Sequence, residues 1–75
     1  MLRIEVDNIQ ARRKLILETE EDIRVEELIK KAGLIFMDKG TGMLISCDKE
    51  GVLPPGKPLN SLNIVSGERL LYLSI

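Results

Sequence analysis

The chain has 75 residues, a length that predicts a single domain over residues 1–75. Its 11 Lys and Arg nearly balance its 12 Asp and Glu, which argues against a generic nucleic-acid binder and against an acidic disordered tail. Histidine is absent, so the chain lacks the commonest general base and a common metal ligand. We therefore expect no enzyme activity, no metal site and no cofactor.

Two β-strands are predicted at the N-terminus. Leu2, Ile4 and Val6 alternate with charged residues, which is the period-two pattern of a strand with one buried face. Residues 7–12 contain turn formers, and residues 14–18 resume a β-favouring run, so the two strands predict an antiparallel hairpin. The interrupted apolar pattern differs from a signal peptide. We expect a cytoplasmic protein without a segment that inserts directly into a membrane.

An amphipathic helix is predicted to begin near residue 23. Asp22 is the expected N-cap, and Lys30 and Lys31 are expected in the last turn, where cations favour the helix dipole. Gly33 is placed to end the helix, although a continuation through residues 34–37 stays open. The apolar face of this helix has the spacing i, i+3, i+4, i+7 and consists of Val25, Leu28, Ile29 and Ala32.

The second half of the chain predicts two more strands. Residues 43–47 form a short β-favouring run after a polar connection. Residues 52–58 hold all three prolines, so regular structure is not expected there, whereas residues 59–64 predict one short helical turn. Residues 69–75 predict the last strand, and their apolar density favours a central position in the sheet.

Three stretches resemble the ubiquitin-like family: residues 1–18, residues 21–31, and residues 58–64 leading into 67–73. In that family a Leu, two polar residues, an apolar residue, Asn or Gly and then Ile precede the last strand, as they do at residues 59–64 here. The resemblance implies an α+β fold, the ubiquitin-like β-grasp, with a mixed sheet of about four strands packed on one helix.

The C-terminus differs from that of ubiquitin and the sulfur carriers. Those proteins end in a Gly-Gly tail that is activated at its carboxylate, whereas this sequence ends Leu73-Ser74-Ile75. The resemblance therefore implies a protein-binding adaptor without a conjugation tail, and it disfavours the alternative of a ubiquitin-like modifier or sulfur carrier. Residues 67–70, Gly-Glu-Arg-Leu, are similar to a turn of the YukD-type proteins, which implies an accessory or regulatory role in bacterial type VII secretion.

Other motifs have simpler interpretations. Cys47 has no histidine to activate it, so a structural thiol is favoured. The acidic residues 18–22 lack the ligand spacing and glycine of a calcium loop. Residues 40–42, Gly-Thr-Gly, precede a strand rather than a helix, which favours a connection over a phosphate-binding loop. The cations at residues 12–14 lack the aromatic residues that stack on nucleic-acid bases, so we expect no nucleic-acid partner.

Apolar residues are too numerous for one buried sheet face. Neighbouring residues of a strand point to opposite faces, so the apolar runs at 15–17, 44–45 and 70–73 place some side chains outward. An exposed apolar patch on that face predicts a protein partner. The reverse register of the last strand stays open, and self-association through an edge at residues 69–75 is a further hypothesis. With Leu15, Leu17, Leu44, Leu71 and Leu73 inward, the predicted protein-binding residues of the outer face are Ile16, Ile45, Leu70 and Tyr72.

Overall fold

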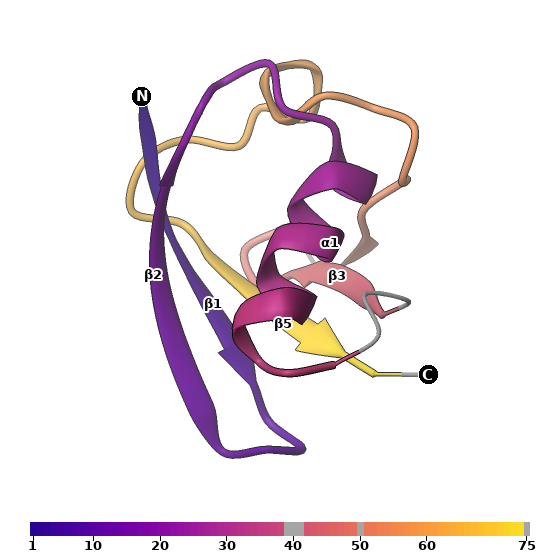
Figure 1. The fold of residues 1–75 in the computed structure, drawn as a ribbon. Helices are drawn as coiled ribbons and strands as arrows, with labels where there is room; N and C mark the ends of the chain where they lie inside the picture. Colours follow the sequence, from indigo (N-terminus) through magenta and orange to yellow (C-terminus); the bar gives the residue numbers. More distant parts are fainter. Residues whose placement is uncertain (39–41, 50, 75) are drawn as a thin grey trace.

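The computed structural model describes residues 1–38, 42–49 and 51–74, in which one helix packs across one face of a mixed β-sheet (Figure 1). The sheet order is β2-β1-β5-β3-β4, with β1 and β5 parallel and the other neighbours antiparallel. The elements in chain order are β1 (Leu2–Asn8), β2 (Arg13–Thr19), α1 (Val25–Ile35), β3 (Met43–Ser46), β4 (Gly51–Val52), the 3₁₀ turn η1 (Leu59–Leu62) and β5 (Arg69–Leu73).

This topology confirms the predicted hairpin, helix and central last strand. The sheet has five strands rather than the four expected, because the two residues of β4 pair with β3. Two residues are too few to show an alternating pattern in the sequence. Since β5 lies between β1 and β3, it is not an edge strand, so the expected free edge is wrong for residues 69–73, whereas self-association of the protein stays a prediction.

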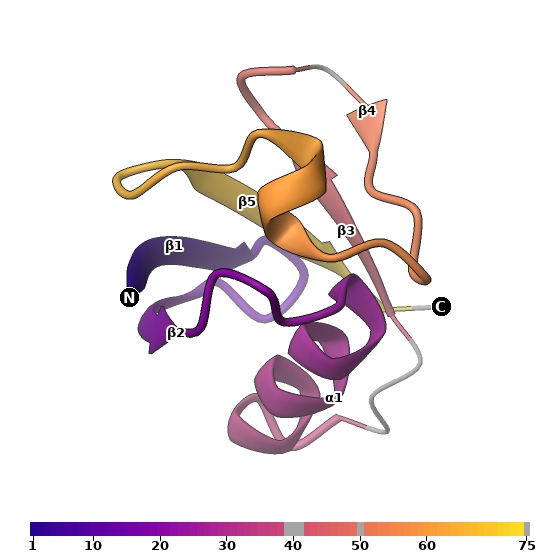
Figure 2. The ribbon, with the colours of Figure 1, turned by 90° about the horizontal axis from the view of Figure 1, so that it is seen from above.

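The hydrophobic core lies between α1 and the sheet. α1 contributes its predicted apolar face, and η1 lies over one end of this core, as the view in Figure 2 shows. Leu59 of η1 is fully buried. The core residues are Leu2, Ile4, Val6, Val25, Leu28, Ile29, Ala32, Phe36, Leu44, Leu53, Leu59, Ile64, Leu70 and Tyr72.

The start of α1 is bound by the proline-rich segment. Its N-cap is Arg24, so the prediction of Asp22 is wrong. The free N–H groups of the first turn donate to carbonyl oxygens far along the chain: Val25 N to Lys57 O at 3.0 Å, and Glu26 N to Pro55 O at 2.9 Å. These backbone acceptors satisfy donors that a side-chain cap would otherwise serve.

α1 continues past the predicted stop at Gly33, which is buried inside the helix. The helix ends instead at Ile35, with Phe36 as its C-cap, and Met37 just beyond the cap adopts a left-handed conformation with φ 59°. Asp38 N donates to Gly33 O at 2.7 Å, and Met37 N donates to Leu34 O at 3.2 Å. This pair of bonds is the Schellman motif. Because the helix is longer than expected, the two lysines at 30 and 31 lie before its last turn.

Candidate functional site

Alternation along β5 assigns its side chains to the two faces of the sheet. Leu70 and Tyr72 are both fully buried in the core, so their predicted place on the outer face is wrong, and the reverse register holds. The physical reason is that the Tyr72 ring packs against Phe36, with ring centroids 5.5 Å apart. Its hydroxyl donates to Asp38 Oδ2 at 2.7 Å, which satisfies the polar end of the buried side chain.

Leu71 therefore lies on the outer face, together with Ile45 of β3. Ile45 pairs with Leu71 on one side and with Val52 of β4 on the other, and Met43 pairs with Leu73. Val52 is 59% exposed, and the other four side chains are half-buried. We call this group the apolar sheet surface, and it consists of Met43, Ile45, Val52, Leu71 and Leu73.

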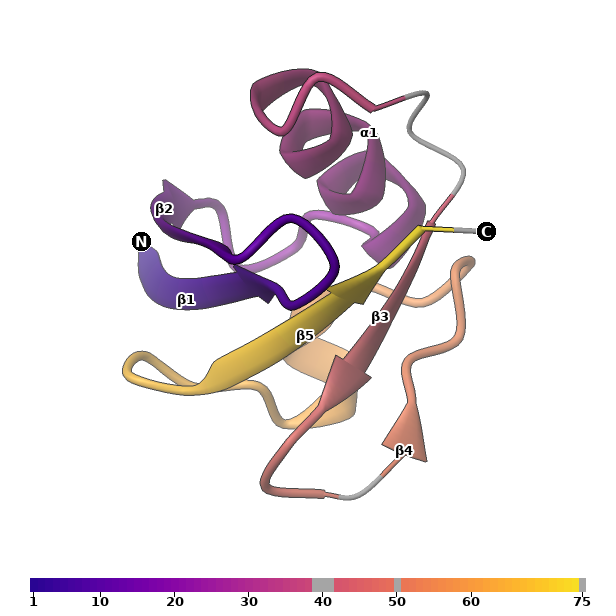
Figure 3. The ribbon, with the colours of Figure 1, turned by 90° about the horizontal axis from the view of Figure 1, so that it is seen from below.

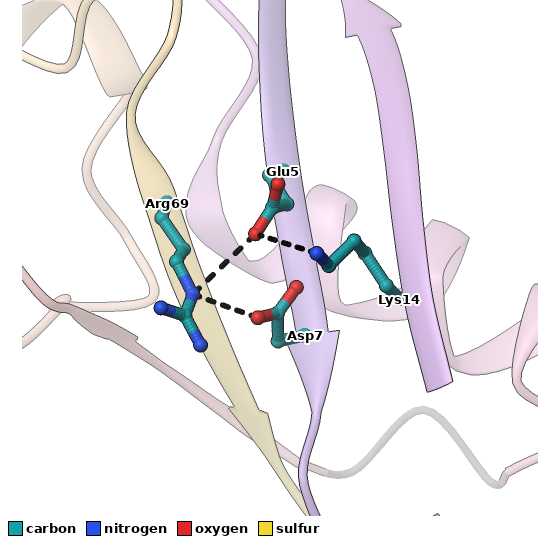
Figure 4. Close-up of polar contacts among 4 residues, drawn as sticks. All are labelled: Glu5, Asp7, Lys14 and Arg69. Carbon is teal, nitrogen blue, oxygen red and sulfur yellow. Dashed lines mark hydrogen bonds and ion pairs between the residues drawn. The ribbon is translucent and has the colours of Figure 1, made fainter. Parts of the chain in front are cut away.

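Charged side chains occupy the other half of the outer face (Figure 4). Arg69 Nε lies 2.7 Å from Asp7 Oδ2 and 3.4 Å from Glu5 Oε2, and Lys14 Nζ lies 3.9 Å from Glu5 Oε2. The hydrogen bond from Arg69 to Asp7 raises the pKa of the guanidinium. We call Glu5, Asp7, Lys14 and Arg69 the charged row.

The charged row separates Ile16 from the apolar sheet surface. Ile16 of β2 is exposed and pairs with Glu5, which in turn pairs with Arg69. Ile16 lines a separate hollow of about 360 Å³ with Arg3 and the turn before β5. The structure thus keeps Ile45 and Ile16 on the predicted face but does not bring them together.

Sequence reasoning missed four members of the apolar sheet surface: Met43, Val52, Leu71 and Leu73. For the two leucines, the alternation of β5 was visible, but its phase was not. The one distinguishing residue in this run was Tyr72. Its hydroxyl needs a hydrogen-bond partner when the ring is buried, and the sequence of the run does not show that Asp38 supplies one.

The described part of the chain was searched for side-chain groups that could hold a metal ion. No group of three or more His, Cys, Asp or Glu side chains within residues 1–38, 42–49 and 51–74 could hold a metal ion. Cys47 is partly buried beside β5, and its backbone N donates to Arg69 O at 3.3 Å. Among the described helices, none combines the length and apolar character needed to cross a membrane.

Comparisons with known proteins identify the architecture. No protein-family model matches the sequence, and no curated protein matches it. A de novo designed protein based on ubiquitin superposes with a TM-score of 0.82 at 23% identity, covering 96% of this chain and 85% of the designed one. The ubiquitin-like domain of an Arabidopsis thaliana protein, determined by solution NMR, superposes with a TM-score of 0.83 at 15% identity, covering 99% of this chain and 79% of that one. The chain therefore has the ubiquitin-like β-grasp fold.

Proposed function

We propose that this protein is a binding adaptor that docks a protein partner through the apolar sheet surface. The observation that carries the proposal is the continuity of five partly exposed apolar side chains across three adjacent strands. Contiguous apolar surface of this kind usually marks an interaction site, whereas single exposed aliphatic residues do not. Ubiquitin-like domains generally act in protein interactions, which supports the same reading.

The sheet gives this surface a rigid support. β5 is hydrogen-bonded on both sides, and β3 lies between β5 and β4, so the backbone beneath Ile45 and Leu71 is held in place. A pre-ordered surface loses little conformational entropy when a partner binds. The charged row borders the surface, and the Arg69 side chain is 56% exposed, so it can supply the polar rim that is typical of protein interfaces.

Two substitutions test the proposed surface. Ile45→Asp and Leu71→Asp each place a carboxylate within it without touching the core, whereas a change at Tyr72 would disrupt the core. We expect each to weaken partner capture from native lysate by about tenfold or more, as loss of a central interface contact does. The matched control is Val65→Asp, because Val65 is 58% exposed and lies outside the surface.

Circular dichroism and thermal unfolding would confirm that all three variants stay folded. Undiminished capture by both sheet variants would contradict the proposal, as would an equal loss in Val65→Asp.

The variant Ile16→Asp tests whether the interface extends across the charged row. We expect capture to persist in that variant, because Ile16 is separated from the apolar sheet surface.

An accessory role in bacterial type VII secretion is a narrower form of this proposal, based on the turn at residues 67–70. The fold gives those residues structural roles. Gly67 has φ +93°, which glycine tolerates, and the buried Glu68 carboxylate accepts from Val65 N at 3.3 Å and Lys49 Nζ at 2.6 Å. The secretion role predicts secretion components among the captured proteins. Their absence would contradict the secretion role but not the proposed docking surface.

A further inference from the structure

A second exposed apolar group lies where α1 ends. Leu34 is 77% exposed, Ile35 is 45% exposed and Met37 is 88% exposed. Three such side chains within four consecutive residues are not the scattered surface aliphatics found on most proteins. Their high exposure means that they protrude from the molecule. This group is separate from the apolar sheet surface, because it belongs to α1 and the turn that follows it, and α1 packs on the other face of the sheet.

Lysines precede these residues by one helical turn. Lys30 lies four positions before Leu34, and Lys31 lies four positions before Ile35, so each pair shares a side of the helix. Both lysines are exposed. Leu34 and Ile35 therefore each have a lysine on the same side of the helix, one turn earlier.

The β1–β2 turn adds more cations at the same end of the molecule. Figure 3 shows this turn and the C-terminal end of α1 on the side facing the viewer. Gln10 and Ala11 of the turn line a hollow of about 310 Å³ together with Met37. Ile9 is 56% exposed and lines a second hollow with Asp7, with Arg12 of the turn, and with Arg13 and Lys14 at the start of β2.

Carboxylates gather at the opposite end. The end of β2 and the start of α1 hold Glu18, Glu20, Glu21, Asp22, Glu26 and Glu27, all exposed. At the basic end, Asp38 accepts hydrogen bonds from Tyr72 and Ser74, Asp7 pairs with Arg69, and Glu5 Oε2 lies 3.9 Å from Lys14 Nζ. Arg3, which pairs with Glu18, and Arg24, the N-cap of α1, lie among the carboxylates of the opposite end, so charge is unevenly distributed between the two ends without being fully separated. An uneven distribution of charge orients a protein toward a negative surface.

We propose that this end of the protein docks on an anionic lipid surface, with Leu34 and Met37 entering the headgroup layer and the neighbouring cations contacting anionic headgroups. Protruding apolar side chains near several cations combine burial of apolar surface with attraction to anionic lipids, and these two contributions set the strength of binding at a membrane interface. The contact is peripheral and leaves α1 folded on the sheet. It also leaves the apolar sheet surface free, since β3, β4 and β5 contribute nothing to it.

Co-sedimentation with vesicles tests this proposal on the full chain. The probes are vesicles of phosphatidylcholine with about one third phosphatidylserine, and vesicles of phosphatidylcholine alone. We expect the protein to bind the anionic vesicles at low salt, and to bind the neutral vesicles at least about fivefold more weakly. Binding should weaken as salt rises, because screening reduces the contribution of the cations. Equal binding to both vesicle types, or to neither, would overturn the proposal.

Matched variants locate the contact. Lys31→Glu should lower the vesicle partition coefficient by about fivefold or more, and Leu34→Ser by about tenfold. Their controls are Lys57→Glu, which is the same charge reversal, and Val65→Ser, which likewise replaces an exposed aliphatic side chain by serine. Both positions are exposed and lie away from the basic end, so these variants should bind as the parent protein does. Equal losses in tests and controls would overturn the assignment. The protein could instead self-associate in the absence of vesicles, in a concentration-dependent way that Leu34→Ser abolishes. That result would identify a second copy of the chain as the occupant of this surface, and would also overturn the proposal of a lipid contact.

Discussion

Tyr72 determines which side of β5 faces the core. Its ring packs on Phe36, and its hydroxyl reaches Asp38 just beyond α1. The reverse phase would bury Leu71 and Leu73 and would expose the tyrosine, so it would forfeit both contacts. The hydrogen bond of the Tyr72 hydroxyl therefore helps to determine which residues of β5 face the core. It thereby also determines which leucines a partner protein can reach.

The environment of Tyr72 predicts a measurable shift. Burial and the Asp38 carboxylate together raise the pKa of Tyr72 to about 12, with burial the larger cause. The chain has one tyrosine and no tryptophan, so the ultraviolet absorbance of the phenolate reports this residue alone. We expect a titration midpoint near 12 in the folded protein and near about 10 in urea. A folded-state midpoint near the urea value would contradict the buried placement.

The raised pKa of Tyr72 also determines how the free energy of unfolding changes with pH. The folded state holds the phenolic proton more tightly than the unfolded state, so unfolding releases a proton between pH 10 and 12. The contribution of this group is fully present below about pH 10, and about 2 to 3 kcal/mol is lost as the pH rises through 12. Tyr72→Phe should remove this part of the alkaline decline in the free energy of unfolding.

Met37 gives a second prediction at the residue scale. A residue with a β-carbon in the left-handed conformation costs about 1 kcal/mol, and glycine is the usual occupant of this position in a Schellman motif. Met37→Gly should raise the free energy of unfolding in urea by about 0.5 to 1 kcal/mol. Leu34→Gly, inside the helix, should lower it by about 1 kcal/mol. A destabilised Met37→Gly would contradict the observed helix end.

At the scale of elements, short-range sequence patterns correctly predicted the strands and the helix that are determined by burial of one face. The period-two alternation of β1 and the helical spacing of α1 follow from each segment having one buried face, so both were visible in the sequence. The start of α1 was not, because its acceptors at Pro55 and Lys57 lie far along the chain. The candidate site was predicted only in part, because the phase of each strand decides which of its apolar residues face outward. The phase expected for β3, with Leu44 inward and Ile45 outward, was correct, whereas the phase expected for the consecutive apolar residues of β5 was wrong.

The approach of β3 to β5 gives a prediction at this scale. A β-carbon added at Gly42, just before β3, would lie 2.5 Å from Leu73 O and 2.7 Å from Tyr72 Cζ. Gly42→Ala should therefore lower the free energy of unfolding by about 1 to 3 kcal/mol, since the backbone must move. Gly56→Ala is the matched control, because its β-carbon would meet no atom within 4 Å, and we expect a change within about 0.5 kcal/mol. Equal effects in urea denaturation would argue against the close crossing.

At the scale of the whole molecule, one small fold presents two chemically distinct surfaces. The outer face of the sheet joins an apolar half to the charged row, and the basic end of the molecule joins protruding aliphatic side chains to cations. The apolar sheet surface belongs to β3, β4 and β5, whereas the basic end is formed by α1, the β1–β2 turn and the start of β2, so we expect protein capture and vesicle binding to be separable. Leu34→Ser should keep its protein partner, and Ile45→Asp should keep its binding to anionic vesicles. Joint loss of both activities in either folded variant would contradict two independent surfaces.

NMR of the labelled protein tests the proposed sheet interface most directly. Titration with a captured partner should shift backbone amide signals of β3, β4 and β5, with the largest changes around Ile45 and Leu71. Signals of the outward side of α1, such as those of Glu27 and Lys30, should change little. Shifts concentrated on α1 or β2, with Ile45 and Leu71 unaffected, would contradict the apolar sheet surface as the site of partner binding.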